Sequence, residues 1–363
     1  MNRQEYSIYF SRTIYAAQWY ILAPATLAIA NQEHVGKELI GFLPFAFIVG
    51  AAITQIPAAI FSSRIGPKKT FIIGLFILSL SDIVVSFTNS FFQALLLRIF
   101  AGMGAGLYFS PAAAVLVNSN RQKSVTLMGL YNAAFSIGGL IGLSWGLIDA
   151  LIGWRMATSI GGLIGVIAAI ENVFYVKDVK LNKIQKIVFD KKLTLLGIAT
   201  SGIWGGSYAV GELMPSYVSQ IFKVSPYMTS PLISLYFVGN IIGGGLASIF
   251  EKRNKIKGIF IMTILTGMIY PLFGLLNIYF MALISLINGM LINTSTSIYY
   301  AIAVDLSSKS NESFSLSLIN LINMVLGVWV SPLFSFAMGI NLALPLYILL
   351  AVTIIPVVLI RKL

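Results

Sequence analysis

Two arginines stand inside long apolar stretches of the sequence, where a charge is costly. Arg12 lies in the apolar run near residues 8–30, and Arg98 lies in the run near 92–117. Hydrocarbon solvates a guanidinium poorly, so Arg98, about two turns into its run, must be paired or hydrated. We therefore expect a functional role or an ion pair for Arg98, with snorkelling to the lipid surface as the alternative.

Acidic side chains are also rare in these runs, which makes each a candidate for proton coupling. Asp82 precedes and Arg98 follows the predicted turn near Asn89 by similar distances, so an antiparallel helix pair would place them at similar depth. We predict an ion pair between them, with a structural role and a coupling role both open. Glu212 is the second candidate, and solvation at a membrane interface is the alternative for it.

Polar side chains recur at helical spacing along several of the runs. Residues three or four positions apart share one face of a helix, so each set forms a stripe. The stripes contain Arg12, Tyr15, Gln18 and Trp19; Ser201, Trp204, Tyr208 and Glu212; and Gly289, Asn293, Thr296 and Tyr300. Hydrogen bonding between helices is the alternative to a binding role for the Asn, Ser and Thr residues.

The elements that must position these residues are membrane-spanning helices. Of the 363 residues, 58% are hydrophobic and 10% are charged, whereas a soluble domain is usually about a quarter charged. Runs of roughly 20 apolar residues recur, and each is long enough to cross the hydrocarbon core of a bilayer. The first run lacks a signal-peptide cleavage site, so we interpret it as a span. We predict an all-α membrane protein with twelve helices near 8–30, 39–62, 70–88, 92–117, 125–149, 155–176, 193–212, 229–250, 258–276, 279–304, 314–338 and 341–360.

Basic residues gather in alternate gaps between these runs. Nineteen Lys and Arg residues lie in one set of gaps and three lie in the other. By the positive-inside rule the richer side is cytoplasmic, so we predict a multi-pass protein of the cell membrane with both termini in the cytoplasm. The net charge of +12 then reflects topology, and no nucleic-acid partner is expected because no basic helix face or aromatic RNA-binding motif accompanies it.

The composition excludes several kinds of catalytic site. The chain has no cysteine and one histidine, His34, which excludes disulfides, zinc–thiolate sites and a metal cluster built from histidines. It also lacks the G-x-x-x-x-G-K-[ST] motif that binds ATP, so hydrolysis does not drive it. We expect no enzyme activity, no cofactor and no metal.

The two halves of the sequence resemble each other. At one constant offset, Gly50, Ala58, Ile60, Phe61, Arg64 and Lys68 match Gly239, Ala247, Ile249, Phe250, Arg253 and Lys257. Asn132 and Gly139 match Asn320 and Gly327 with the offset changed by one. A parallel repeat of this kind predicts two like bundles with a binding site at their interface. The predicted domains are a six-helix bundle over 1–176, a basic cytoplasmic linker over 177–192 and a second six-helix bundle over 193–363.

The gap after the second predicted helix, residues 59–69, carries a motif. It resembles the major facilitator superfamily signature G-x-x-x-D-R-x-G-R-K through Arg64, Gly66 and Lys68. It departs from that signature at Ala59, Ser63 and Pro67. In the family this loop helps to lock the cytoplasmic gate, and Ser63 in place of the acid removes one partner of that lock. An ordinary basic turn between two helices is the alternative.

The fourth predicted helix strengthens the resemblance. Arg98, Gly102, Gly104 and Gly106 are similar to the family's pattern R-x-x-x-G-x-G-x-G, and the triplet Gly153-Trp154-Arg155 is also familiar in it. Glycines allow another backbone to approach closely, so we expect these three to be packing residues. The family's antiporter signature has Pro where Gly139 stands, which argues against a proton-coupled drug exporter.

The resemblance implies that helices 1, 4, 7 and 10 line a central cavity. The implied solute contacts are Arg12, Gln18, Trp19, Arg98, Tyr108, Trp204, Tyr208, Asn293, Thr296 and Tyr300. The implied gating or motif residues are Arg64, Gly66, Lys68, Gly102, Gly104, Gly106, Asn132 and Asn320, and the candidates for proton coupling or an ion pair are Asp82 and Glu212.

The function that the resemblance implies is secondary active or facilitative transport by alternating access. We expect a monomer in the lipid bilayer that moves a small solute, an organic anion or a sugar-like molecule, with protons as a candidate coupling ion. A drug or metabolite exporter of the same fold is one alternative. A non-transporting membrane receptor or structural protein is another.

Overall fold

The computed structural model describes residues 2–32, 34–119, 124–177, 179, 190–250, 254–275, 277–306 and 312–362. Within these ranges all regular structure is helical and no strand occurs, so the predicted all-α class is confirmed. Most of the predicted basic linker, residues 178 and 180–189, lies outside the described residues.

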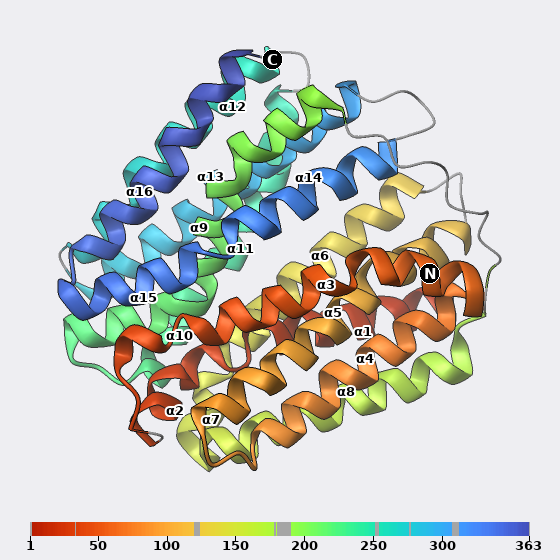
Figure 1. Ribbon diagram of the computed structural model, residues 1–363, viewed down its shortest axis with the longest axis horizontal. Helices are drawn as coiled ribbons and strands as arrows, with labels where there is room; N and C mark the ends of the chain where they lie inside the picture. Colours follow the sequence, from red (N-terminus) through yellow and green to blue (C-terminus); the bar gives the residue numbers. More distant parts are fainter. Residues whose placement is uncertain are drawn as a thin grey trace. The chain divides into compact units, whose positions relative to one another are not determined.

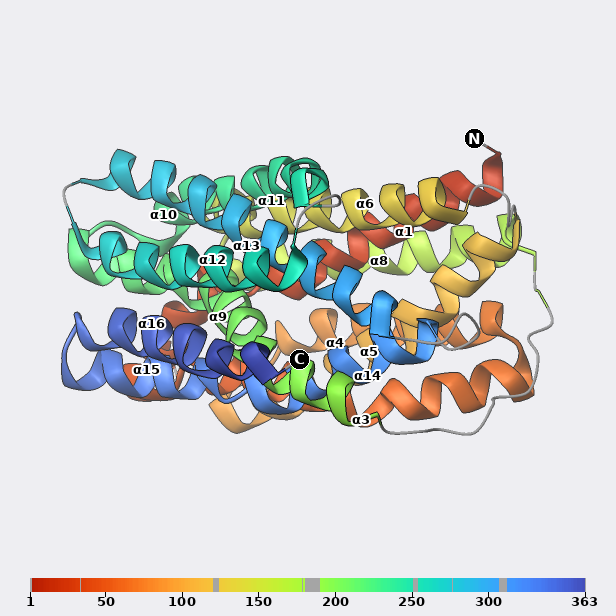
Figure 2. The same ribbon diagram turned by 90° about the horizontal axis from the view of Figure 1, so that it is seen from above.

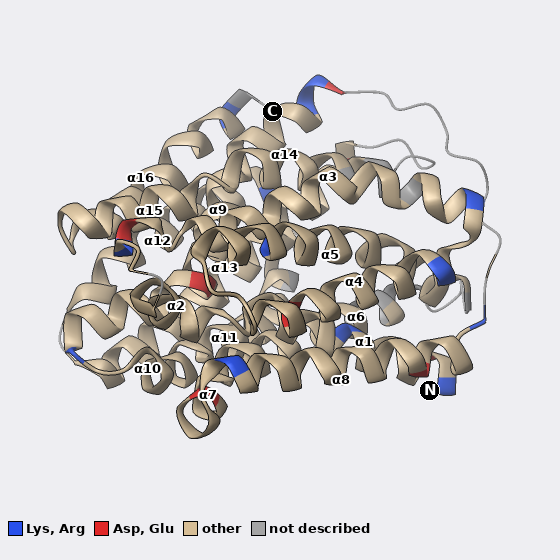
Figure 3. Ribbon diagram, turned by 60° about the horizontal axis from the view of Figure 1, so that its bottom comes forward, with Lys and Arg blue, Asp and Glu red and all other residues tan. Residues whose placement is uncertain are grey.

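Ten helical segments of the described chain are long and apolar enough to cross a membrane. They are Arg3–Gln32, Lys37–Ala58, Phe91–Asn118, Leu130–Ile152, Trp154–Tyr175, Pro226–Leu246, Lys255–Gly274, Ile278–Ala303, Leu318–Ile340 and Leu344–Arg361. Two further predicted spans coincide with helices α4 (Pro67–Val85) and α9 (Lys191–Phe222), which are not among these ten segments. Helix α4 carries Lys68, Lys69 and Asp82, and α9 is rich in small and polar side chains. Charged residues are few along the helices as a whole (Figure 3).

The chain divides into two compact units, of which unit 1 comprises Met1–Ala25 and Ala46–Lys186. Its helices are α1 (Arg3–Tyr20), most of α3 (Phe42–Ile65), α4, α5 (Phe91–Ser119), α6 (Ser124–Ser144), α7 (Gly146–Ile152) and α8 (Trp154–Tyr175), with a short 3₁₀ helix at Ala23–Ala25. Helix α4 packs against both α5 and α8 (Figure 1). The sequence dictates where α1 begins, because Asn2 and Glu5 form a capping box in which each side chain binds the other's backbone N–H.

Unit 2 comprises Thr26–Phe45 and Ile187–Leu363. Its helices are α2 (Thr26–Gln32), the start of α3, α9, α10 (Pro226–Ile233), α11 (Leu235–Leu246), α12 (Lys255–Ile269), α13 (Ile278–Leu306), α14 (Glu312–Gly327), α15 (Val330–Ile340) and α16 (Leu344–Val357), with 3₁₀ helices at Lys37–Leu39, Ala247–Phe250, Tyr270–Gly274 and Val358–Lys362. Helices α15 and α16 lie side by side (Figure 2). Part of its core packs between α9, α13 and α14, where Leu196, Tyr299 and Ile319 are fully buried.

One close glycine contact between two helices has a counterpart in the other unit. In unit 1, a methyl group on Gly102 of α5 would lie 1.8 Å from the Phe47 carbonyl oxygen of α3. In unit 2, a methyl group on Gly289 of α13 would lie 1.9 Å from the Tyr236 carbonyl oxygen of α11. The reciprocal contacts are made by Gly50 and Gly239. The repeat that the sequence predicts through Gly50 and Gly239 therefore recurs as the same backbone approach in both units.

Candidate functional site

Arg12 is buried in α1, with 4% of its surface exposed, and it lies among four aromatic rings. Its Cζ atom lies 4.3 Å from the ring centroid of Tyr131, 4.6 Å from Phe135, 4.8 Å from Tyr15 and 4.9 Å from Phe109. We call these five residues the Arg12 cage. Helix α1 supplies Arg12 and Tyr15, α5 supplies Phe109, and α6 supplies the other two rings. The negative face of each ring attracts the cation.

No carboxylate pairs with Arg12 in the described part of the chain. Its Nε and Nη1 atoms are buried and have no hydrogen-bond partner among the described residues. A cation–π contact contributes about 0.5–2 kcal/mol, whereas a buried donor without an acceptor costs roughly 1–3 kcal/mol. The rings therefore stabilise the charge but leave Nε and Nη1 of the guanidinium without acceptors among the described residues.

Three other predicted solute contacts adjoin the Arg12 cage. Tyr108 stacks on Tyr15, with 4.5 Å between ring centroids. The Trp19 ring lies edge-on to Phe135 at 5.7 Å. Arg98 donates a hydrogen bond of 3.3 Å from Nη2 to the Trp19 carbonyl oxygen. The structure thus brings Arg12, Trp19, Arg98 and Tyr108 into one cluster within unit 1.

Gln18 lies on a different face of α1 and joins three helices. Its Nε2 donates to the Ser79 hydroxyl of α4 at 3.2 Å and to the Gly161 carbonyl of α8 at 3.3 Å. This places its amide away from the Arg12 cage.

Asp82 is buried on α4, and its predicted ion pair with Arg98 stays a prediction.

The stripe on α9 in unit 2 has its aromatic members in contact. The Trp204 ring stacks on Tyr208 with 5.6 Å between centroids. The Tyr208 hydroxyl donates to the Pro44 carbonyl oxygen of the same unit at 3.2 Å. Glu212 follows one turn later and is also buried. The stacking of Trp204 on Tyr208 agrees with their spacing of four residues, which places both on one face of α9.

The stripe on α13 is held by hydrogen bonds to neighbouring helices. Asn293 donates from Nδ2 to the Asn240 carbonyl oxygen of α11 at 2.6 Å. The Tyr300 hydroxyl donates to Oδ1 of Asn320 on α14, which joins a predicted solute contact to a predicted gating residue. Thr296 is half-buried between them. Asn293 and Tyr300 thus make the bonds between helices that the alternative interpretation describes.

The loop that resembles the family signature is anchored within unit 1. Gly66 has φ 93°, a conformation that other residues rarely adopt, and Pro67 follows it at the start of α4. Lys68 donates from Nζ to the Val173 carbonyl oxygen at 2.8 Å, near the C-terminal end of α8. A cation at that end is favourable because the helix dipole is negative there. Arg64 is exposed.

The glycines of α5 are packing residues, as the sequence predicts. Gly102 and Gly106 face α3, and Gly104 faces α4, where an added methyl group would lie 2.4 Å from the Leu78 nitrogen. Asn132, by contrast, is exposed on α6.

Sequence reasoning did not identify two groups. The first is the set of rings Phe109, Tyr131 and Phe135; the spacing of Tyr131 and Phe135 by one helical turn was a usable signal. The second is Asp149 on α7, which is 2% exposed and has both carboxylate oxygens without a hydrogen-bond partner among the described residues. As a lone acid near the end of an apolar run, Asp149 could have been noted from the sequence.

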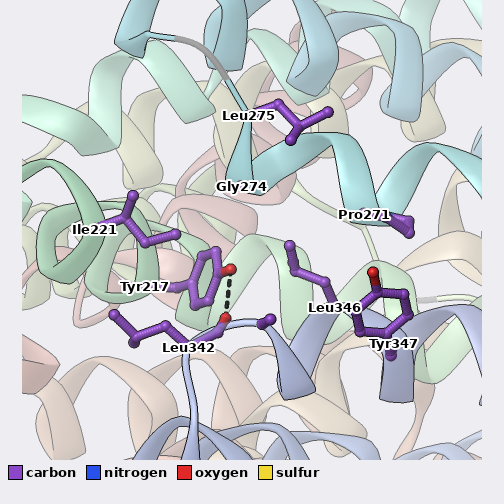
Figure 4. A pocket seen from close by; sticks show the side chains of 9 residues that line it. Tyr217, Ile221, Pro271, Gly274, Leu275, Leu342, Leu346 and Tyr347 are labelled. Carbon is purple, nitrogen blue, oxygen red and sulfur yellow. Dashed lines mark hydrogen bonds between the residues drawn. The ribbon is translucent and has the colours of Figure 1, made fainter.

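A separate pocket of about 370 Å³ lies within unit 2. It is lined by Tyr217, Ile221, Pro271, Gly274, Leu275, Leu342, Ala343, Leu346 and Tyr347 (Figure 4). The Tyr217 hydroxyl donates to the Leu342 carbonyl oxygen at 2.7 Å, and none of the predicted site residues lines the pocket.

Two curated proteins share partial sequence similarity with the chain. Multidrug resistance protein 2 of Bacillus subtilis (strain 168) is 29% identical over 159 residues, which are 44% of this chain and 40% of that protein. Quinolone resistance protein NorA of Staphylococcus aureus (strain MRSA252) is 25% identical over 183 residues, which are 50% of this chain and 47% of that protein. The match thus spans less than half the length of either relative.

Solved structures match almost the whole chain, and so does a family description. The POT family transporter PepTSo has a TM-score of 0.82 at 11% identity, covering 100% of this chain and 97% of that one. A bacterial homologue of the human lysosomal transporter Spinster, inward-facing and unoccupied, has a TM-score of 0.76 at 15% identity, covering 99% and 94%. Identities this low show the fold alone. Residues 8–332 match the model of the Major Facilitator Superfamily, so the chain belongs to that family.

Proposed function

We propose that this protein is a secondary active or facilitative transporter that moves a small organic solute across the cell membrane by alternating access. The observation that carries the proposal is the Arg12 cage, a buried guanidinium with unmet donors inside a helix of a Major Facilitator Superfamily protein. An ionisable residue at such a depth usually marks a solute or ion pathway. A protein with a purely structural role has no need of a buried guanidinium whose donors lack acceptors.

The proposed architecture has twelve spans in two six-helix bundles over 1–176 and 193–363, with a cytoplasmic linker over 177–192. Helices α4 and α9 would supply two spans besides these ten segments. The glycine contact that occurs in both units supports a repeated design. The distribution of Lys and Arg supports cytoplasmic termini. We propose a monomer, with Asp82 and Glu212 as candidate groups for coupling to protons.

Cysteine accessibility tests alternating access cleanly, because the chain has no native cysteine. Trp204→Cys and Asn293→Cys would be labelled with a membrane-impermeant maleimide added to either side of oriented vesicles. Labelling from both sides, in proportions that change when solute is added, is the expected result. Leu196→Cys is the matched control on α9, because Leu196 is fully buried and should stay unlabelled. Labelling from one side only under all conditions would favour the receptor or structural alternative.

Drug or metabolite export is the second candidate function. The curated relatives named for multidrug and quinolone resistance favour it. Expression in a host that lacks its own exporters is then expected to raise the tolerated concentration of a quinolone. Unchanged tolerance at confirmed expression would speak against export of that class and leave uptake as the remaining direction.

A further inference from the structure

We infer that the Arg12 cage is a subsite for the carboxylate of a monoanionic solute with an aromatic or otherwise apolar body. This inference rests on the proposed transport function and names its substrate class. It assigns Arg12 the recognition of the anion, and it assigns the four rings the recognition of the apolar body.

Charge balance selects the monoanion. The cage holds one cation, and no carboxylate of the described chain neutralises it. Arg98 is engaged separately, by the Trp19 carbonyl oxygen and by the Phe47 ring at 4.3 Å. A carboxylate would neutralise Arg12 and accept hydrogen bonds from Nε and Nη1, the two donors that lack acceptors. A dianion would leave a buried net charge, and a neutral sugar would leave the cation unpaired.

The internal repeat indicates that the fold itself does not require a cation here. At the sequence offset that matches Asn132 with Asn320, Arg12 corresponds to Thr200 and Phe135 corresponds to Asn323. In unit 2 the Thr200 hydroxyl lies 2.9 Å from the Leu196 carbonyl oxygen of its own helix and 3.1 Å from Oδ1 of Asn323, so neutral groups occupy the corresponding place. Since a neutral pair suffices for packing in unit 2, the guanidinium in unit 1 points to a ligand.

The exposure of the rings shows the side from which a solute would enter. Tyr15 and Tyr131 are fully buried, whereas Phe109 and Phe135 are half-buried. Ser110, next to Phe109 along α5, is exposed. A solute would therefore reach Arg12 past the two phenylalanine rings, and the rings around the guanidinium would pack against its apolar body.

Binding of a series of matched probes tests the subsite. The full-length protein in lipid nanodiscs is dialysed against radiolabelled 2-naphthoate, its neutral isostere 2-naphthamide and the cation 2-naphthylmethylammonium, with empty nanodiscs subtracted. We expect saturable binding of 2-naphthoate, and weaker binding of the other two by about 10- to 100-fold, the effect of losing a hydrogen bond to a charged group. Equal binding of the acid and the amide would overturn the inference.

Two arginine variants locate the effect. Arg12→Met is expected to weaken 2-naphthoate binding by about 10- to 100-fold and to leave 2-naphthamide binding nearly unchanged. Arg3→Met is the matched control, because Arg3 also lies over an aromatic ring, Tyr175 at 3.6 Å, but is exposed. Unchanged 2-naphthoate binding by folded Arg12→Met would refute the assignment. If Arg12→Met does not fold, the probe series on the unaltered protein still decides.

The outcomes for the subsite and for transport are separable. Uptake of some solute by reconstituted vesicles without any 2-naphthoate binding would remove the subsite and leave the transport proposal. Saturable 2-naphthoate binding that depends on Arg12, in a protein that transports none of the three probes, would keep the subsite and count against transport.

Discussion

The packing of α1 against α6 in unit 1 resembles the packing of α9 against α14 in unit 2. A methyl group on Gly138 of α6 would lie 2.0 Å from the Thr13 carbonyl oxygen of α1. A methyl group on Gly327 of α14 would lie 2.8 Å from the Ser201 carbonyl oxygen of α9. Small residues let both pairs of backbones approach closely, and this packing supplies stability where lipid offers no hydrophobic drive.

The two helix pairs differ at the residue just before that contact. It is Arg12 in unit 1, surrounded by rings, and Thr200 in unit 2, hydrogen-bonded to Asn323. A close approach of two helices therefore occurs beside a caged cation in unit 1 and beside a neutral pair in unit 2. Glycines thus allow the close helix contact in both units. The polar residue beside the contact differs, Arg12 in one unit and Thr200 in the other, and the contact is present in both.

Methyl groups on the glycines of the repeated contact are expected to have the largest effect. Gly102→Ala and Gly289→Ala would each place a carbon against a backbone carbonyl, which cannot move aside as a side chain can. We expect each to lower the free energy of unfolding by about 3 kcal/mol or more, read from thermal midpoints in detergent.

Gly245→Ala is the control for this pair, because no atom lies within 4 Å of the added methyl group. If Gly289→Ala were as stable as Gly245→Ala, the close contact in unit 2 would not exist, and the likeness of the two units would fail at its main point.

Exchanging the polar pair is the sharper test of the difference between the units. Arg12→Thr combined with Phe135→Asn places the Thr–Asn pair of unit 2 into unit 1. We expect the double variant to fold and to lose 2-naphthoate affinity by about 10- to 100-fold. A double variant that retained full affinity would show that the caged cation has no part in recognition. The measurement is the same dialysis, with the thermal midpoint as the check on folding.

Much of the fold was predictable because the membrane restricts the choices. Long apolar runs must be helices in lipid, since every backbone group has to be satisfied within the segment. The glycine pattern at Gly102 and Gly104 likewise predicts close packing, and the structure confirms it. The predicted spans near 70–88 and 193–212 are helices, yet they are not among the ten segments, since α4 carries three charged residues and α9 is rich in small and polar ones.

The candidate site was less predictable, because it depends on neighbours from distant parts of the chain. The sequence singles out Arg12 by its charge, but nothing in it shows that Phe109 and Tyr131 lie over that charge. Gln18 shows the same limit: it was grouped with Trp19, although they are adjacent in sequence and therefore about 100° apart around the helix. Partners across helices decide the role of such a residue.

Removing the neutral hydrogen bond of unit 2 is expected to have a smaller effect. Thr200→Val keeps the shape of the side chain and removes its bond to Asn323. We expect a loss of about 1 kcal/mol in the free energy of unfolding, with no change in 2-naphthoate binding. Thr263→Val is the control, because the hydroxyl of buried Thr263 bonds the Ile259 carbonyl of its own helix and no other group of the described residues. An equal loss in both variants would mean that the bond to Asn323 contributes nothing of its own.

The smallest expected effect on the free energy of unfolding concerns two lysines, Lys68 at the start of α4 and Lys255 at the start of α12. In unit 1, Lys68 binds a backbone carbonyl of α8, whereas in unit 2, Lys255 forms an ion pair of 2.7 Å with Asp305 of α13. The side chain of Asp305 is 56% exposed, so water and salt screen the pair. A double-mutant cycle with Lys255→Met and Asp305→Asn is expected to give a coupling of about 0.2–1 kcal/mol that shrinks as salt is added.

The acceptor of the Lys68 side chain is a neutral backbone carbonyl oxygen, that of Val173. Added salt therefore screens one charge in this hydrogen bond, whereas it screens two in an ion pair. The loss on Lys68→Met is expected to be about 0.3–1 kcal/mol, the range for a cation at a helix C-terminus, with Lys69→Met as the exposed control. A coupling free energy between Lys255 and Asp305 above about 1 kcal/mol, the upper end expected for an exposed pair, would indicate a pair shielded from solvent. The two loops would then differ in strength and not only in the group that the lysine binds.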